Sequence, residues 1–322
     1  MSEFKTPVKS NSRPEASDKI TIPPSPFLNR LGYGTGVSVM QLTRSPRAGQ
    51  IRSPWALKML NKRVKPDKVY SERIVKEAEL LQRMSHPNIV GFRAFSKTKI
   101  LYLGMEACDI SLGDMIEKRA EDGGEPYSPR QILKVAADIA SALDYLHTKM
   151  QILHGDIKSY NILVNGDFVV CKLCDFGVTV PLDENGVFDQ KSRKAAYYGT
   201  EAWSAPEVFQ GGPLTAKSDI WPLGLTLWEM LALAPPHSLG DDDTLDESAA
   251  SAEGGDGTFD ESMEDYFSDK YGTRPALPAH VCELRYREPL ALFYCCTAPR
   301  PAERPSAAAV AAAAAGPAAA AE

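Results

Sequence analysis

The sequence predicts an α+β fold in which a β-rich first part is followed by a helical second part. Short apolar runs rich in residues that favour strands occupy much of residues 27 to 107. After Cys108 the apolar residues recur at intervals of three and four, which is typical of helices that bury one face. The chain of 322 residues is 43% hydrophobic, which is enough for two lobes or for one large domain.

The N-terminal part divides into an arm and a sheet. Residues 1 to 26 are rich in Ser, Pro and charge, and we expect a flexible arm because this composition buries little apolar surface. Residues 27 to 107 contain strand-like runs such as GVSVMQL, WALKML and ILYLGME. One segment, SERIVKEAELLQRM, has apolar residues at helical spacing. We therefore predict a mostly antiparallel sheet with one helix.

Residues 108 to 306 are predicted to be mainly helical. The longest helix is expected within SPRQILKVAADIASALDYLHTK, where Ser128 is a plausible N-cap and Pro129 a first-turn residue. Its apolar side chains recur on one face, at Ile132, Val135, Ile139, Leu143 and Leu146.

Two segments in the second half of the chain have unusual composition. Residues 239 to 270 are acidic and rich in Gly and Ser, which favours a solvated, mobile insertion over a docking surface for a basic partner. Residues 307 to 322 form an Ala-rich tail that we expect to be a spacer or a terminal helix. Gly316 and Pro317 would break any long helix there.

Composition disfavours several classes of protein. A net charge of −6 gives no sign of direct nucleic-acid binding, and no run reaches the roughly 18 apolar residues that a membrane span needs. The N-terminus lacks the apolar run of a secretory signal, so a cytoplasmic or nuclear location with reduced thiols is expected. The closely spaced Cys171 and Cys174 have no second pair or nearby histidines, so zinc is disfavoured.

The first candidate for chemistry is the glycine-rich turn LGYGTGVSV, which contains Gly32, Gly34 and Gly36. Glycines let backbone N–H groups approach phosphate closely, although an ordinary hairpin would also explain the turn. Lys58 on an apolar strand and Glu77 on the following helix strengthen the first interpretation. Such a lysine could extend to solvent, or, paired with Glu77, hold the phosphates of ATP.

The strongest candidate is the segment HGDIKSYN, which places Asp156, Lys158 and Asn161 close together. Asp175 follows in LCDFGV, one short hairpin further on. Phosphoryl transfer needs a carboxylate that orients a hydroxyl and accepts its proton, and an amide and a second carboxylate that hold Mg²⁺. A polar loop would not need these residues in this order.

With YYGTEAWSAPEV, KSDIWPLGLTLWEM and Arg304 further downstream, the sequence resembles the eukaryotic protein kinase superfamily. The resemblance covers Phe27 to Ser306 and implies a bilobal protein kinase fold. A β-rich N-lobe with one control helix, residues 27–107, would adjoin a helical C-lobe, residues 108–306, with ATP in the cleft between them.

The resemblance implies roles for particular residues. Asp156 would be the catalytic base, Lys158 would neutralise the γ-phosphate, Lys58 and Glu77 would form an ion pair, and Asn161 and Asp175 would bind Mg²⁺. Met105 would be the gatekeeper, and Glu106 to Cys108 the hinge that contacts adenine. The remaining ATP-binding residues would be Leu31, Gly32, Gly34, Gly36, Val39, Ala56 and Leu163. Structural roles would fall to the apolar column Leu81, Phe92, His154 and Phe176, to Asp219, and to a pair of Glu207 with Arg304.

Two positions depart from the family pattern. The third loop glycine is Gly36, while Val37 stands where that glycine usually lies, so the tip of the loop is expected to differ. Gly155 replaces the arginine that ordinarily receives a phosphate of the activation loop, and glycine cannot make that charged contact. We therefore expect activation to depend less on a phosphate docked beside Asp156.

Short motifs such as FKTP, HGDIKS and GTRP resemble a mitosis-linked, dual-specificity group similar to the mitogen-activated protein kinase kinases. This implies transfer to Ser or Thr of protein substrates, with Tyr as a further acceptor. Thr6, followed by proline, is the candidate site for phosphorylation by an upstream mitotic proline-directed kinase. A PDZ ligand ends in an aliphatic residue, and the terminal AAAAE does not favour PDZ-domain binding.

Two other functions are compatible with this fold. A pseudokinase scaffold would bind partners without catalysis, but it would not need Lys58, Asp156, Asn161 and Asp175 together. A kinase of small molecules is disfavoured because GTEAWSAPE resembles a segment that seats a peptide substrate.

Overall fold

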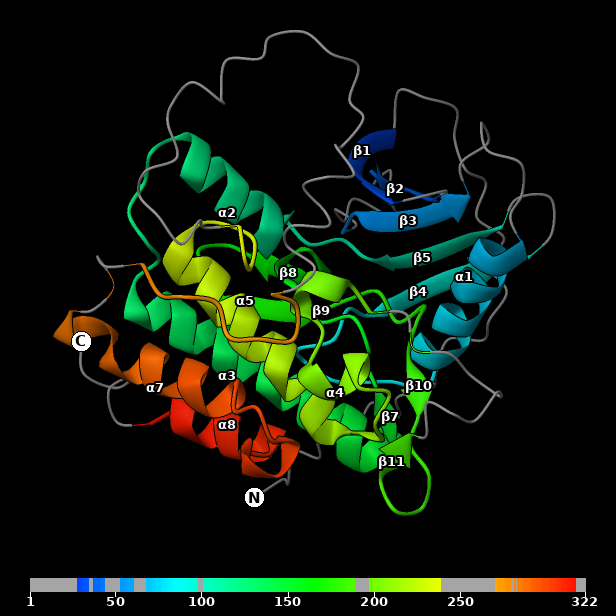
Figure 1. The fold of residues 1–322 in the computed structure, drawn as a ribbon. Helices are drawn as coiled ribbons and strands as arrows, with labels where there is room; N and C mark the ends of the chain where they lie inside the picture. The colour runs from blue at the N-terminus through cyan, green and yellow to red at the C-terminus, as the bar shows by residue number, and fades with distance from the viewer. Residues whose placement is uncertain are drawn as a thin grey trace, which may run out of the picture.

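The chain folds into two lobes, as the sequence predicts. The computed structural model describes residues 28–34, 37–43, 53–60, 68–97, 101–188, 197, 199–238, 270–278, 281 and 283–316. Figure 1 shows a sheet with one helix at the upper right and a larger helical lobe below it. The predicted α+β architecture with a β-rich N-lobe and a helical C-lobe is confirmed.

The N-lobe sheet has five antiparallel strands in the order β1-β2-β3-β5-β4. Lys58 pairs with Val39 on one side and with Leu103 on the other, so it lies in the middle of the sheet. Ala56 and Lys58 share one face because side chains alternate along a strand. The strands are β1 (Leu28–Gly34), β2 (Val37–Leu42), β3 (Trp55–Leu60), β4 (Phe92–Ser96) and β5 (Tyr102–Glu106).

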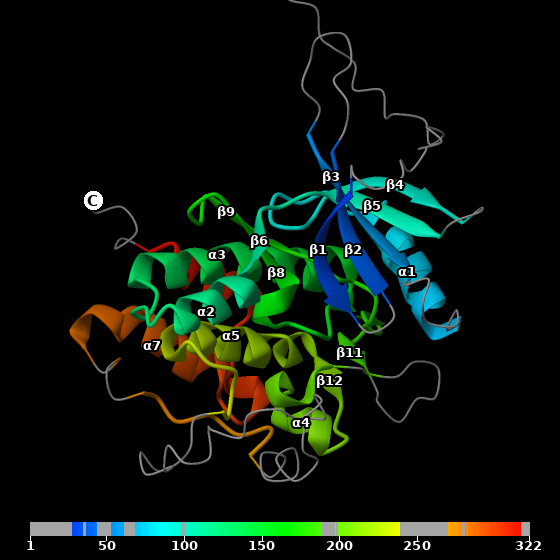
Figure 2. The same ribbon diagram turned by 90° about the horizontal axis from the view of Figure 1, so that it is seen from above.

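One helix, α1 (Lys68–Leu81), packs against strands β3, β4 and β5 (Figure 2). Its buried face is apolar except for Glu77, which is fully buried. The apolar side chains hold the helix on the sheet, and the carboxylate is thereby carried beside the strand that bears Lys58.

The C-lobe is built around α3 and α5. Ser128 caps α3 as predicted: its hydroxyl accepts from the Gln131 N–H at 3.3 Å, and its own N–H donates to the Gln131 side chain at 3.1 Å. The helices are α2 (Leu112–Glu121), α3 (Pro129–Tyr145), α4 (Pro206–Phe209), α5 (Ile220–Ala232), α7 (Arg287–Cys296) and α8 (Ala307–Ala314). A π turn, Leu146–Met150, extends α3, and 3₁₀ turns occupy Ser159–Asn161, Glu201–Trp203, Ala216–Ser218, Leu284–Tyr286 and Pro301–Glu303.

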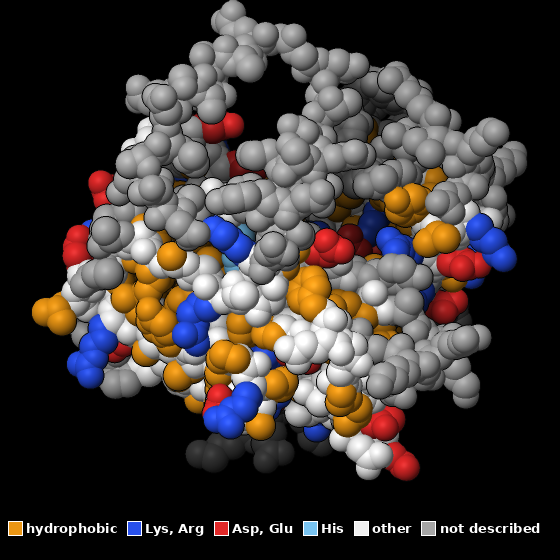
Figure 3. All heavy atoms as spheres, in the orientation of Figure 1, with side chains coloured by type: hydrophobic (Ala, Val, Ile, Leu, Met, Phe, Trp, Pro, Cys, Tyr) orange, Lys and Arg blue, Asp and Glu red, His pale blue; other side chains and the backbone are white. Residues whose placement is uncertain are grey.

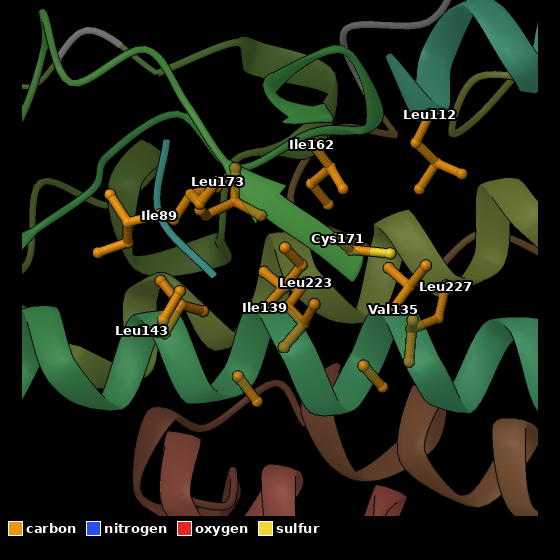
Figure 4. Close-up of a cluster of buried hydrophobic side chains, with 14 of the residues drawn as sticks. Ile89, Leu112, Val135, Ile139, Leu143, Ile162, Cys171, Leu173, Leu223 and Leu227 are labelled. Carbon is orange, nitrogen blue, oxygen red and sulfur yellow. The ribbon is translucent and has the colours of Figure 1, made fainter. Parts of the chain in front are cut away.

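The core of this lobe lies between α3, α5 and strand β9. Every residue of α5 from Ile220 to Leu231 is buried. All five apolar residues predicted on one face of α3 have no exposed surface. Figure 4 shows Val135, Ile139 and Leu143 of α3 packed near Leu223 of α5 and Leu173 of β9. This core provides the rigid base on which the loops of the site rest.

Short strands bring the segment with Asp156 and Asn161 beside the segment with Asp175. Strands β8 and β9 are antiparallel, with Ile162 opposite Leu173, so the segments before β8 and after β9 are neighbours. The Cys174 N–H donates to the Asn161 carbonyl at 3.0 Å. Three strands form one small sheet in the order β6 (Ile110–Ser111), β8 (Ile162–Asn165) and β9 (Val170–Leu173). Two further sheets have two strands each: β7 (Ile152–Leu153) with β10 (Val180–Pro181), and β11 (Val187–Phe188) with β12 (Leu214–Thr215).

Residues 307–314, placed in the Ala-rich tail by the sequence analysis, form α8, which packs against α3. Ala307, Val310 and Ala314 are its buried residues, and their small side chains permit close packing. Thr6 and residues 239 to 269 of the acidic insertion lie outside the described residues. Within the described part of the chain, no helix is long and apolar enough to cross a membrane.

Candidate active site

A cleft of about 750 Å³ lies between the two lobes. Strand β3 and helix α1 contribute Lys58 and Glu77 from above, and the segments around β8 and β9 contribute Asp156, Asn161 and Asp175 from below. In the space-filling view, acidic and basic side chains lie beside one another between the lobes (Figure 3). The sequence therefore brings its candidate residues together in one cavity.

Lys58 links the two lobes by bridging two carboxylates. Its Nζ atom lies 2.8 Å from Glu77 Oε2 and 2.8 Å from Asp175 Oδ1. The other oxygen of Glu77 accepts from the Phe176 N–H at 3.3 Å. Helix α1 is thus tied both to its own sheet and to the segment that follows β9.

The electrostatics of this triad depend on burial. Burial disfavours the Lys58 ammonium, but the charges of Asp175 and Glu77 outweigh it and raise the pKa of Lys58. Burial raises the pKa of Glu77 despite the opposing charge of Lys58. For Asp175, burial is outweighed by Lys58 and by hydrogen bonding, so its pKa falls to about 2. Lys58 and Asp175 therefore carry full charges at neutral pH.

Asp156 is held by three neighbours. Its Oδ1 accepts from the Thr200 hydroxyl at 2.6 Å and from the Thr200 N–H at 3.2 Å. Its Oδ2 lies 3.0 Å from Lys158 Nζ and accepts from Asn161 Nδ2 at 2.9 Å. Lys158 also donates to the Thr200 hydroxyl at 2.6 Å. These contacts fix the carboxylate at the floor of the cleft.

Thr200 was not singled out by the sequence analysis. It occurs in the quoted motif GTE, but nothing in the sequence indicates that its hydroxyl would lie between Asp156 and Lys158, 44 and 42 positions away. The contact joins residues that are far apart in the chain, so it depends on the tertiary fold.

The backbone before Asp156 is fixed from below by Asp219. Its carboxylate accepts from the N–H groups of His154 and Gly155 at 2.9 and 3.0 Å. The His154 ring packs edge-on against Phe176, with 5.1 Å between ring centroids. Phe176 and Leu81 belong to the main core cluster, and Phe92 packs against it. Asp219 and the predicted apolar column thus lie where they can position the catalytic segment.

Some of the residues proposed for ATP binding line the cleft. Val39, Met105, Cys108 and Leu163 line it. Ala56 is buried at 7% exposure, opposite Met105 in the sheet. The Glu106 side chain instead contacts Lys172 and the Gly91 N–H, at 3.0 and 3.1 Å, and its own N–H donates to the Gly91 carbonyl at 2.8 Å. Leu31, Gly32 and Gly34 lie on β1, and Gly36 lies outside the described residues.

Asn161 and Asp175 fit a magnesium site. Asn161 donates through its amide nitrogen to the carbonyl and carboxylate of Asp156, which leaves its amide oxygen as the atom suited to a metal. Mg²⁺ prefers oxygen ligands and usually keeps several waters while binding substrate phosphates, so two protein ligands suffice. Among the described residues, no group of three or more His, Cys, Asp or Glu side chains could hold a metal ion.

Two buried features support the site from a distance: the ion pair of Arg304 with Glu207, and the carboxyl group of Glu229. Arg304 binds Glu207 through two parallel contacts of 2.7 and 2.8 Å, which is the predicted pair. Glu229 was not predicted; its two oxygens accept from Ser159 at 2.6 Å and from Trp203 at 2.8 Å. Burial raises the pKa of Glu229 to about 7. A lone acid in the otherwise apolar segment IWPLGLTLWEM is the signal that could have identified it.

Comparison with known proteins agrees with this geometry. The protein kinase domain family matches residues 27–314. The chain belongs to the protein kinase family. The human lymphokine-activated killer T-cell-originated protein kinase is 42% identical over 322 residues, covering 96% of each chain.

More distant kinases match about half of this chain. Rat mitogen-activated protein kinase kinase kinase 12 is 36% identical over 168 residues, covering 51% of this chain and 18% of its own. Mouse serine/threonine-protein kinase Nek5 is 37% identical over 161 residues, covering 50% and 24%. The predicted resemblance to the eukaryotic protein kinases is confirmed.

Proposed function

We propose that this kinase is catalytically active and transfers the γ-phosphate of ATP to Ser and Thr hydroxyls of protein substrates. The observation that carries the proposal is that Lys58 and Asp156 both line one cleft, each held by its own set of neighbours. Lys58 is paired with Glu77 and Asp175, while Asp156 is held by neighbours that leave it facing the cavity.

Each side chain has a chemical task in this reaction. Asp156 orients the incoming hydroxyl and accepts its proton, and Lys158, 3.0 Å from that carboxylate, offsets negative charge as it develops. Lys58, kept cationic by its two carboxylates, holds the phosphates. Asn161 and Asp175 would hold Mg²⁺, which when bound with ATP neutralises phosphate charge.

The finer specificity is supported by kinship. A relative named as a serine/threonine-protein kinase and another named as a kinase of the mitogen-activated cascade both match the kinase region. We extend the proposal to a dual-specificity enzyme of the mitogen-activated protein kinase kinase type that acts in mitosis and also accepts Tyr. Its location would be the cytoplasm, the nucleus or both.

A pseudokinase scaffold is the alternative. The presence of Lys58, Asp156, Asn161 and Asp175 together in one cleft argues against it, because a scaffold would not need all four. The test is transfer of labelled phosphate from ATP to a panel of protein substrates by the wild type and by Asp156→Asn in parallel. Transfer that is lost only in the variant supports the proposal, and equal transfer in both would point to a contaminating kinase.

Regulation through the N-terminal arm is proposed on the motif alone. Thr6 would be phosphorylated by an upstream mitotic, proline-directed kinase, since proline follows it. Phosphopeptide mapping from dividing and resting cells tests this, and a Thr6 without phosphate in dividing cells would remove the proposal. PDZ domains are not proposed as partners.

A further inference from the structure

The residue that replaces the usual arginine beside the catalytic base has an aromatic neighbour. Gly155 has a φ of 82°, a conformation that favours glycine. A β-carbon at this position would lie 3.4 Å from the Val178 carbonyl and 3.6 Å from Cε2 of Tyr197. The Tyr197 ring therefore lies at van der Waals distance from the position where a β-carbon of residue 155 would be.

A second glycine makes room for the opposite edge of the same ring. A β-carbon on Gly199 would lie 2.6 Å from Cε1 and 2.8 Å from the hydroxyl oxygen of Tyr197. These distances are too short for a β-carbon, so Gly199 is needed for the ring to lie where it does, whereas Gly155 is required by its backbone conformation.

Tyr197 also joins a small apolar cluster below the catalytic segment. It packs against a cluster whose buried members come from β7, β10, β11 and β12, namely Leu153, Val180, Phe188 and Leu214. Burial, with the nearby negative charges of Asp219, Asp156 and Glu207, raises the pKa of Tyr197, so its hydroxyl stays neutral. The ring is held by packing, and its neutral hydroxyl also hydrogen-bonds with Ser204.

The position of Tyr197 matters because Thr200 follows three residues later. Thr200 makes two hydrogen bonds to Asp156 and one to Lys158. A displaced Tyr197 would release the segment that places these donors.

We propose that Tyr197 is a positioning residue. Its ring, set between Gly155 and Gly199, holds the segment that carries Thr200 against the segment that carries Asp156, without a phosphate. In a kinase with arginine at position 155, a bidentate contact to a phosphate would do this work. Here an apolar contact replaces the charged one. The inference rests on the proposed function and specifies how the segments that carry Thr200 and Asp156 are held together in that site.

The test uses the full chain after treatment with a protein phosphatase. Wild type, Tyr197→Phe and Tyr197→Ala are compared for kcat and for the KM of peptide and of ATP. Tyr294→Ala is the matched control, because Tyr294 is a half-exposed tyrosine on α7. Leu214→Ala weakens the same cluster from β12 without touching the catalytic segment.

We expect phosphatase-treated wild type to remain active and Tyr197→Phe to stay within about twofold of it, because the ring carries the contact. Tyr197→Ala should lose about 100-fold in kcat/KM for peptide, as expected for misplaced catalytic groups, while its KM for ATP is unchanged. Leu214→Ala should shift the same constants in the same direction, and Tyr294→Ala should not.

Hydrogen exchange at residues 199 to 205 provides a readout that does not need turnover. Tyr197→Ala should speed exchange there and leave α5 protected, which a globally unfolded variant would not do. If wild type exchanges as slowly as expected but transfers no phosphate, the proposed function is wrong while the positioning role of Tyr197 still stands. The inference is overturned if Tyr197→Ala matches wild type in kcat/KM for peptide and in exchange, or if phosphatase treatment alone abolishes wild-type activity.

Discussion

At the scale of single residues, Lys58 shows how burial decides the role of a charged side chain. A lysine on an apolar strand could extend to solvent, but here its side chain is 12% exposed and lies between two carboxylates. Replacing it by Met would leave both carboxylates without a cation. We expect Lys58→Met to lower the free energy of unfolding by about 3 kcal/mol, measured by chemical denaturation.

The matched control is Lys68→Met on the same helix that carries Glu77. The Lys68 side chain is 90% exposed and pairs with Glu72 at 3.7 Å. Its loss should change the free energy of unfolding by less than about 0.5 kcal/mol. Equal effects of the two substitutions would show that the ion pairs of Lys58 contribute no more than a surface contact.

The sequence indicated most residues of the site but only some of their supports. Asp156, Asn161 and Asp175 carry chemistry that only a few residue types can perform, so their order along the chain is informative. Thr200, Tyr197 and Glu229 each contact residues 26 or more positions away, and their own residue types are common in loops and helices. Contacts of this kind are set by tertiary packing and leave no local pattern.

At the scale of elements, the pair of Glu207 and Arg304 joins α4 to the turn that precedes α8. Arg304 is 1% exposed and also lies over the Trp221 ring at 5.0 Å. Arg304→Met would leave the Glu207 carboxylate buried without its cation, and we expect a loss of about 3 to 5 kcal/mol in the free energy of unfolding. Arg300→Met, which removes an exposed pair with Glu303, should have little effect in the same denaturation experiment.

Helix α5 carries a group that makes stability depend on pH. The raised pKa of Glu229, about 7, means that the folded protein binds this proton more tightly than the unfolded chain. Ionisation between about pH 5 and about pH 8 therefore costs stability, by up to about 3 kcal/mol. Glu229→Gln should flatten this decline when unfolding is measured across that range, whereas Glu288→Gln, at an exposed position of α7, should keep it. An unchanged slope in Glu229→Gln would contradict the burial argument.

Elements were predictable where local signals and packing agree. The cap at Ser128 and the apolar face of α3 appear in the sequence, and both are confirmed. The expected helix 71–84 begins earlier, at Lys68, and ends at Leu81, because helix ends depend on contacts with the sheet. The close approach of α5 and α7 requires Gly224, whose β-carbon would lie 2.8 Å from Cys296, and this need becomes visible only once the helices are packed.

At the scale of the whole molecule, the two lobes meet through Lys58, Glu77 and Asp175, and a ligand in the cleft would add further contacts between them. Ligand binding to the folded state alone raises the free energy of unfolding, by about 2.7 kcal/mol at a concentration 100 times the dissociation constant. We therefore expect ATP to raise the melting temperature of the intact chain as a single cooperative unit.

Magnesium should increase this stabilisation through Asp175. The carboxylate, with a pKa lowered to about 2, is fully charged at neutral pH and can ligate the ion, whereas an amide is a weaker ligand. Wild type should therefore show a larger ATP-induced shift with Mg²⁺ than with a chelator, and Asp175→Asn should show the same small shift in both. Asp109→Asn, which changes another acid lining the cleft, is the control and should keep the magnesium increment. If Asp175→Asn retained the full increment, the metal would be held by other groups and the role assigned to Asp175 would be wrong.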